Sequence, residues 1–407
     1  MVLATGQRDE GRRLMRRSIL ALNAGSSSIK FRLYDLAASA ELDLASRGSL
    51  DLGDAPRLTA KAADGELQCD RPLAADASRD MGIGQMLQWI ENELGGRKLI
   101  AAGHRIVHGG REFVEPVRLM PTIIEALDRL TPLAPLHQPR SLAPIRALAA
   151  LRPDLPQVGC FDTAFHRTIE PLVSRFALPR HYEADGIHRY GFHGLSYEYV
   201  AGRLKQISPD LAAKRTIVAH LGNGASLCAM RDGRSVDTTM GFSALDGLVM
   251  GTRCGAIDPG VLLYLLLERG ISGEALQDML YEESGLLGVS GISGDMRTLE
   301  ASDDRRAREA VELFAFRAAR EIAALANTLG GFECLVFTGG IGEHSAPARK
   351  AICDRLGWLG VAIDEAANSS HAALMSQAES KVEVRVVATD EEGVIARHTR
   401  KVMEGPG

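Results

Sequence analysis

A pattern of strand, small-residue turn and strand occurs twice in this chain of 407 residues, and it constrains the fold more than any other feature. The first copy reads Leu20-Ala-Leu-Asn-Ala-Gly-Ser-Ser-Ser-Ile-Lys30, and the second reads Val218-Ala-His-Leu-Gly-Asn-Gly-Ala-Ser-Leu-Cys228. Ser28 and Ser226 align 198 positions apart, close to half the chain. A duplicated domain leaves this kind of repeat. The chain length also suits about two domains of ordinary size.

Apolar periodicity along the rest of the chain predicts alternating strands and helices, and therefore an α/β fold. Strands are expected at 18–23, 29–33, 99–107, 156–161, 216–221, 334–338 and 382–388. Helices are expected at 85–94, 122–130, 303–329 and 391–402. The helix at 303–329 has the clearest pattern, with a cap from Ser302 or Asp303 and a stop at Gly330-Gly331.

Composition excludes several classes of protein. A net charge of −5 argues against nucleic acid or an anionic membrane surface as the main partner. No stretch approaches the roughly 20 apolar residues of a membrane span. The six cysteines form no C-x-x-C pair, which indicates free thiols in a reducing cytoplasm. Residues 1–17 carry five arginines without an apolar core, so we expect a disordered extension and no secretory signal.

Glycine-rich turns follow two of the expected strands, at 222–226 and 339–343. Such turns let backbone N–H groups approach a phosphate. Neither turn is a P-loop or a complete dinucleotide fingerprint, and a single glycine turn is more often only a turn. Together with the turn at 25–28, they favour a nucleotide held between two halves of the molecule.

Several charged residues stand where an anionic substrate would need them. Arg105 ends a buried-looking strand and Arg253 lies in a glycine-flanked loop, and guanidinium groups suit carboxylates and phosphates. Pairing with a structural carboxylate is an equally good interpretation of either arginine. His193 and His137, taken singly, are more typical of packed, hydrogen-bonded histidines. Asp162 follows a strand, where a carboxylate can help to hold Mg²⁺.

These segments together resemble the acetate kinase family. The resemblance runs in family order from about Ile19 to Thr399. Its motifs are the segments 23–30, 103–110, 134–139, 161–166, 189–194, 220–224, 237–241, 295–297, 337–343 and 389–392.

The resemblance implies a duplicated ribonuclease-H-like fold, of the actin, sugar kinase and Hsp70 type, with the nucleotide in the interdomain cleft. The first domain would comprise 18–165 and 393–407, and the second 166–392. The implied reaction is reversible transfer of the ATP γ-phosphate to acetate, giving acetyl phosphate and ADP, with Mg²⁺ or Mn²⁺. The family is cytoplasmic and homodimeric, without nucleic-acid or membrane partners.

The family's site residues carry over onto matching positions. Its catalytic residues fall on Asp162, His193 and Arg253, although Asp162 can instead orient an arginine or a metal-bound water. Its substrate residues fall on Arg105, Val107, Leu136 and Phe192, and its metal residues on Asn23 and Glu391. Its nucleotide residues fall on Lys30, His220, Leu221, Gly222, Asn223, Gly224, Asp295, Met296, Arg297, Gly340, Ile341, Gly342, Glu343 and His344.

The chain departs from the family pattern at a few positions, which leaves alternatives open. The departures are Gln138, Leu195, Tyr197, Ala244, Ala256, His344 and Asp390. Ala244 replaces a proline that helps to close the acyl pocket, so a propionate or butyrate kinase with a wider pocket is one alternative. An ATP-dependent binding protein on the same fold is another, but it requires a separate peptide-binding domain.

Overall fold

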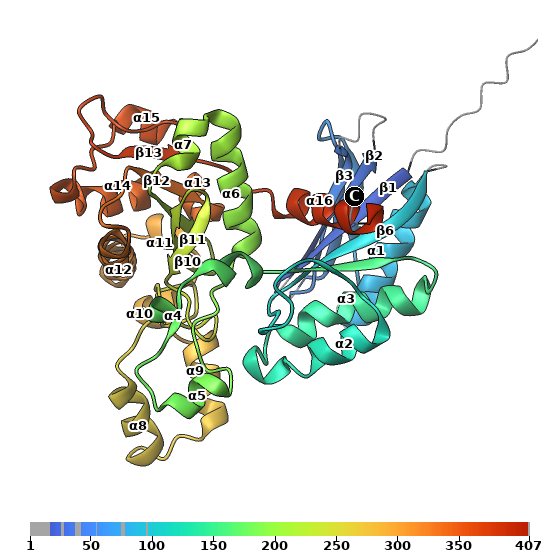
Figure 1. Cartoon of the computed structure of the whole chain (residues 1–407), viewed down its shortest axis with the longest axis horizontal. Helices are drawn as coiled ribbons and strands as arrows, with labels where there is room; N and C mark the ends of the chain where they lie inside the picture. Colours follow the sequence, from blue (N-terminus) through green and yellow to red (C-terminus); the bar gives the residue numbers. More distant parts are fainter. Residues whose placement is uncertain are drawn as a thin grey trace, which may run out of the picture.

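The computed structural model describes residues 17–25, 28–36, 42–53, 55–74, 78–94 and 97–405. The expected N-terminal extension lies outside these residues, apart from Arg17, which begins the first strand. Figure 1 shows two lobes, each built around one β-sheet.

The first lobe contains an eight-stranded sheet in the order β5-β4-β3-β2-β1-β6-β8-β7. Its strands are β1 (Arg17–Ala24), β2 (Ser28–Leu36), β3 (Leu42–Asp51), β4 (Arg57–Ala62), β5 (Leu67–Pro72), β6 (Lys98–Ile106), β7 (Val117–Arg118) and β8 (Gln157–Phe161). β1 to β5 form an antiparallel meander, whereas β1, β6 and β8 are parallel.

The second lobe contains a five-stranded sheet in the order β11-β10-β9-β12-β13. Its strands are β9 (Thr216–Leu221), β10 (Ala225–Arg231), β11 (Arg234–Thr238), β12 (Cys334–Thr338) and β13 (Glu383–Val386). β9 to β11 are antiparallel, whereas β9, β12 and β13 are parallel. The arrangement repeats β3-β2-β1-β6-β8 of the first sheet, which confirms the duplicated fold expected from the sequence.

Helices cover both sheets. Those before the second sheet are α1 (Arg79–Glu93), α2 (Pro121–Asp128), α3 (Gln138–Leu151), α4 (Pro171–Ser174), α5 (Arg180–Ala184), α6 (Gly194–Ile207) and α7 (Pro209–Ala213), with 3₁₀ turns η1 (Thr131–Leu133) and η2 (Ala164–Thr168). The later ones are α8 (Pro259–Leu267), α9 (Gly273–Glu282), α10 (Gly285–Ser290), α11 (Met296–Glu300), α12 (Arg305–Leu329), α13 (Gly339–His344), α14 (Ala346–Asp354), α15 (Glu365–Ser369) and α16 (Glu391–Glu404), with η3 (Gly357–Leu359). The last helix, α16, returns to the first lobe and packs on β1, β6 and β8 (Figure 1).

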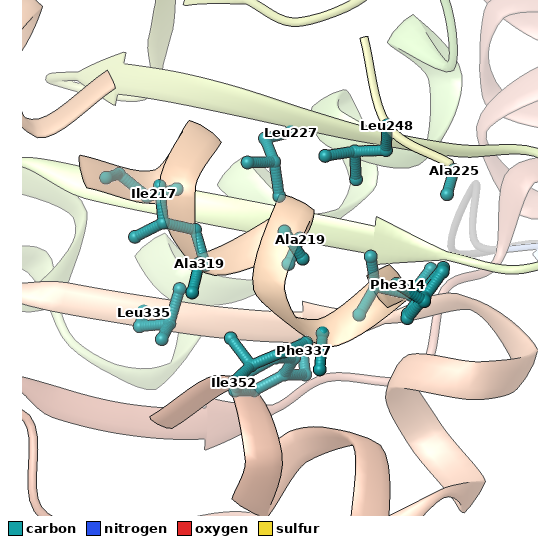
Figure 2. Close-up of a cluster of buried hydrophobic side chains, with 14 of the residues drawn as sticks. Ile217, Ala219, Ala225, Leu227, Leu248, Phe314, Ala319, Leu335, Phe337 and Ile352 are labelled. Carbon is teal, nitrogen blue, oxygen red and sulfur yellow. The ribbon is translucent and has the colours of Figure 1, made fainter. Parts of the chain in front are cut away.

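The long helix α12 forms the centre of the second lobe's core. Figure 2 shows Phe314 and Ala319 against Leu335 and Phe337 of β12. Burying one such side chain contributes about 1.5–3 kcal/mol. The expected stop at Gly330 is confirmed by its left-handed conformation, whereas the expected cap is wrong, because Asp304 and not Ser302 or Asp303 accepts the free N–H of Arg306.

Candidate active site

A cavity of about 830 Å³ lies between the two lobes, and it contains most of the charged residues selected from the sequence. Seven cationic residues line it: Lys30, Arg32, Arg47, Lys61, Arg105, Arg140 and Arg253. Its acidic lining residues are Glu343, Glu391 and Glu392. This excess of cations suits anionic ligands.

Two glycine loops meet on the second-lobe side of the cavity. In the first, the Gly222 N–H donates to the Gly224 carbonyl at 3.1 Å and closes a tight turn after β9. In the second, Gly339 has a φ of 78°, and a Cβ there would lie 2.8 Å from the Leu221 carbonyl oxygen. Glycine at 339 therefore lets α13 begin directly against the end of β9. Both loops bring bare backbone to the cavity, as a phosphate requires.

Arg105, at the end of β6, is held by two partners. Its Nε and Nη2 donate to Oδ2 of Asp162 at 2.9 and 2.6 Å, and its Nη1 donates to Oδ1 of Asn23 at 3.3 Å. Burial alone would lower the pKa of Arg105, but the Asp162 and Glu391 carboxylates outweigh burial and raise it. A guanidinium has five N–H donors, so two remain for a ligand.

Asn23 connects this arginine to the start of α16. Its Nδ2 donates to Glu391 and to Glu392, each at 2.9 Å. Burial alone would raise the pKa of Glu391, but Arg105, His220 and the Asn23 hydrogen bond outweigh burial and lower it. The Glu391 carboxyl is therefore ionised at neutral pH.

Asn23, Glu391 and Glu392 bring oxygen atoms of the kind that a hard cation prefers close together, with the Asn23 oxygen accepting from Arg105. One oxygen of Glu391 and one of Glu392 converge on the same amide group. Carboxylate and amide oxygens are the ligands that Mg²⁺ prefers. Within the described ranges, no group of three or more His, Cys, Asp and Glu side chains is arranged to bind a metal ion, so this mixed set is the candidate.

Arg253 differs from Arg105 because, within the described residues, it forms no ion pair with a carboxylate. Its Nη1 donates to the Ala244 carbonyl at 2.9 Å, and no Asp or Glu among the described residues lies within 4.0 Å. Burial lowers the pKa of Arg253 and Arg105 adds to this effect, whereas Tyr281 and Glu282 act in the opposite direction. A half-buried guanidinium without an ion-pair partner, at a cavity wall, is well suited to binding an anion.

His193 occupies a strained position before α6, with a φ of 58°. The following residue, Gly194, donates its N–H to the Asp162 carbonyl at 3.0 Å. A Cβ at Gly194 would lie 2.1 Å from that oxygen, so only glycine fits there. This contact joins the partner of Arg105 to the backbone that carries His193, and non-glycine residues in this conformation are concentrated at functional sites.

The His193 and His220 rings stack with their centroids 4.2 Å apart. His193 Nδ1 lies 2.8 Å from the Ser226 hydroxyl, and His220 Nδ1 lies 2.8 Å from the Ser196 hydroxyl. Burial, followed by His220 and the arginines, holds the pKa of His193 well below its ordinary value. Burial also lowers the pKa of His220, so both rings are neutral at physiological pH.

An apolar wall adjoins Arg105. Val107 and Phe192 are buried and belong to one hydrophobic cluster, and Ala244 packs against that cluster. His166 Nε2 donates to the Phe192 carbonyl at 2.9 Å. Gln138 donates to the His108 carbonyl at 3.1 Å and accepts from the His108 N–H at 3.2 Å. These two bonds fix the backbone directly after Val107.

The structure brings most of the predicted site residues together. Those that line the cavity are Asn23, Lys30, Arg105, Val107, His193, His220, Gly222, Asn223, Gly224, Arg253, Gly340, Glu343, His344 and Glu391. Asp162 is buried behind Arg105. The remaining predicted residues are not among the lining residues: Leu136, Phe192, Leu221, Asp295, Met296, Arg297, Ile341 and Gly342.

Other residues at the site were not among the predicted catalytic, binding or metal residues. Arg32 pairs with Asp390 at 2.6 Å and Glu392 at 3.4 Å. The adjacent glutamates 391 and 392 were the available signal for Glu392. His137 lines the cavity, and burial, followed by Arg253 and Arg105, lowers its pKa to about 3. Ser226 was noted only as part of the repeat and Tyr197 only as a departure from the family pattern. The hydrogen bonds that connect them to His193 depend on how α6 packs on β10.

Comparison with known proteins identifies close relatives. The profile of the Acetokinase family matches residues 18–397. A protein named acetate kinase from Rhodopseudomonas palustris is 50% identical over 392 residues, which cover 95% of this chain and 98% of that protein. One of the same name from Nitrobacter hamburgensis is 48% identical over 389 residues, covering 95% and 96%.

Solved structures show the same fold. A propionate kinase from Francisella tularensis superposes with a TM-score of 0.86 at 37% identity, covering 94% of this chain and 99% of that one. Porphyromonas gingivalis acetate kinase superposes with a TM-score of 0.83 at 34% identity, covering 95% and 100%.

Proposed function

The chain belongs to the acetokinase family, and on that premise we propose that it is an acetate kinase, which transfers the γ-phosphate of ATP reversibly to acetate. One observation carries the proposal: Arg105, Arg253 and His193 face one cavity beside two glycine loops. Both reactants are anions, so cations must bring them together. Phosphoryl transfer relies mainly on positioning and charge stabilisation.

Each residue has a defined task in this scheme. Arg105 holds the carboxylate of acetate with its two free N–H donors, while Asp162 and Asn23 hold the arginine. Arg253 and His193 stabilise charge on the phosphoryl group during transfer. Acetate is already ionised at neutral pH, because its pKa is roughly 4–5, so no general base is required.

The nucleotide is proposed to lie along the glycine loops of the second lobe. Its binding residues would be Lys30, 220–224, 295–297 and 340–344. Asn23 and Glu391, together with Glu392, would hold Mg²⁺ or Mn²⁺. The cation supplies charge neutralisation at the phosphates.

The acyl pocket determines which acid is used. Val107, Leu136 and Phe192 are proposed to line it, with the small Ala244 nearby. A buried methylene contributes about 0.8 kcal/mol, so a slightly wider pocket could favour propionate or butyrate.

The proposed function is tested by trapping acyl phosphate as the hydroxamate, with ATP and Mg²⁺ and with acetate, propionate and butyrate in parallel. We expect product with acetate most strongly. Product mainly from a longer acid would establish the alternative substrate, and absence of product with every acid would overturn the proposal.

We propose that two domains, 18–165 with 393–407 and 166–392, close over these substrates in the cytoplasm. The packing of α16 on the first sheet supports these boundaries. The six free cysteines support a reducing compartment. Within the described residues, no helix is long and apolar enough to span a bilayer.

We propose a homodimer, with helix α8 in the interface. The helix reads Pro-Gly-Val-Leu-Leu-Tyr-Leu-Leu-Leu, and none of its residues is buried. Leu263 is 56% exposed and Leu267 is 75% exposed. Continuous apolar surface of this kind is typical of an interface between subunits. Light scattering should show a dimer that Leu263→Glu with Leu267→Glu converts to a monomer.

A further inference from the structure

We propose that Ser226, held by Tyr197, is a positioning residue that keeps His193 in the neutral tautomer with its proton on Nε2, facing the cavity. The catalytic consequence rests on the proposed function, whereas the tautomer itself does not.

The inference starts from a chain of three side chains at the junction of α6 and β10. The Ser226 hydroxyl lies 2.8 Å from Nδ1 of His193 and 2.5 Å from the Tyr197 hydroxyl. Ser226 and Tyr197 are both fully buried. In the described part of the chain, neither hydroxyl makes any other hydrogen bond.

The number of available protons determines which group donates in each of these hydrogen bonds. The buried Tyr197 hydroxyl has Ser226 as its only acceptor, and burial raises the pKa of Tyr197 well above its ordinary value, so its proton stays on and is donated to Ser226. Ser226 then has a single proton of its own, for which Nδ1 of His193 is the remaining acceptor. The reverse direction would leave a buried O–H group without an acceptor, which is costly. His193 Nδ1 is therefore an acceptor, and the proton of the neutral ring is on Nε2.

The protonated nitrogen faces the place where charge would develop. A Cβ at Gly224 would lie 3.4 Å from Nε2 of His193 and 3.7 Å from Nη1 and Nη2 of Arg253. The ring and the guanidinium therefore border the same space above the glycine turn. In the other neutral tautomer, Nε2 would present a lone pair to an incoming anion, and the interaction would be repulsive.

The neighbouring ring is arranged in the same way. The Ser196 hydroxyl is buried, and in the described ranges its hydrogen bond to Nδ1 of His220 is the only one it makes. It therefore donates its proton and leaves Nε2 of His220 protonated. Two stacked neutral imidazoles thus present N–H donors to an anion, although burial prevents either from carrying a full charge.

The tautomer can be read directly from long-range ¹H–¹⁵N correlations of the full chain labelled with [¹⁵N]histidine. His166 provides an internal standard, because its Nε2 must be protonated to donate to the Phe192 carbonyl. We expect His193, identified from the spectrum of His193→Gln, to show the same pattern as His166. A wild-type spectrum with the proton on Nδ1 would overturn the proposal without any variant being made.

Variants then test whether the Ser226 hydroxyl determines the tautomer of His193. Ser226→Ala removes the donor and should give a mixture of both tautomers, with kcat lowered about 10- to 100-fold and KM for acetate and ATP nearly unchanged, as for other supporting residues around a reacting group. Tyr197→Phe leaves Ser226 able to donate but removes its anchor, so the loss should be smaller. Tyr199→Phe, on the same helix, is the matched control and should change neither the spectrum nor kcat.

The outcomes separate this proposal from the proposed function. If Ser226→Ala retains the wild-type tautomer, or loses activity only through KM, Ser226 is not a positioning residue. If the wild-type chain forms no acyl phosphate, the proposed function fails, but the spectra still decide the tautomer. If Ser226→Ala does not fold, Tyr197→Phe replaces it, and an unchanged kcat in that variant would count against the proposal, because removing the anchor of Ser226 would then have no effect.

Discussion

Asp162 accepts two hydrogen bonds from Arg105 on one carboxylate oxygen, at 2.6 and 2.9 Å, while its backbone carbonyl binds the residue after His193. Asp162 thus joins Arg105, the proposed carboxylate-binding residue of one lobe, to the backbone next to His193, the proposed phosphoryl-binding residue of the other. Its side chain is 1% exposed and is separated from the cavity by Arg105. This position supports a role in orienting the arginine and not one in taking a proton.

The first prediction concerns this pair. Asp162→Ala should lower the free energy of unfolding by about 3–5 kcal/mol, because it leaves the Arg105 charge buried without its partner. Asp162→Asn keeps the volume and should retain the fold better, with KM for acetate raised as the arginine loses its fixed orientation. Denaturant unfolding and initial rates measure both effects. Equal KM values in Asp162→Asn and the wild-type chain would contradict the orienting role.

Arg253 should behave in the opposite way. Arg253→Gln removes a buried cation without a carboxylate partner, so the melting temperature of the ligand-free chain should be unchanged or higher. Activity should nevertheless fall by about 10²–10³, by analogy with the loss of one oxyanion-hole donor. Arg105→Gln is the matched comparison and should lose both activity and stability. A marked loss of stability in Arg253→Gln would show that its charge is structural.

Arg349 anchors the glycine loop at 339–343, the proposed nucleotide loop, although it is fully buried and forms no ion pair in the described ranges. Its Nη1 donates to the carbonyls of Gly342 and Glu343 at 2.9 Å, at the negative end of α13. Arg349→Met should cost more than about 2 kcal/mol, because these carbonyls lose their partner, and should raise KM for ATP more than KM for acetate. Arg355→Met, nearby on the surface, is the control. Unchanged KM for ATP in Arg349→Met would exclude this anchoring role.

Acid should unfold the protein through its buried histidines. Burial lowers the pKa of His104 to about 3 and that of His108 and His166 to about 4, whereas an unfolded histidine titrates near 6.5. Below about pH 6.5 the unfolded chain therefore binds protons that the folded chain does not, so stability is lost as pH falls from 6.5 towards 4. Each histidine contributes about 1.4 kcal/mol per pH unit in that window.

Circular dichroism at a series of pH values measures this loss. In His104→Leu, the free energy of unfolding should fall less steeply with falling pH, because one proton fewer is taken up on unfolding. An unchanged slope in His104→Leu would mean that this histidine does not drive acid unfolding.

The repeat around Ser28 and Ser226 indicated a duplicated domain, and the resemblance to the acetate kinase family implied the particular duplicated fold that the two sheets confirm. Arg105 and Asp162 could be selected because both end a strand at the same sheet edge. The pairing of Ser226 with His193 could not, since it depends on the packing of α6 against β10. Arg349 also escaped prediction, because its partners are backbone carbonyls together with the Asn368 and His371 side chains, which only the packing of α14 on α15 brings to it.

The most direct test of the central claim is ³¹P nuclear magnetic resonance of the purified chain with ATP, Mg²⁺ and acetate. The account predicts that acetyl phosphate appears in equal amount with ADP, and that Arg253→Gln slows the appearance of both by about 10²–10³. Release of inorganic phosphate with ADP, without acetyl phosphate, would contradict it, because the cavity would then be transferring the phosphoryl group to water and not to a carboxylate.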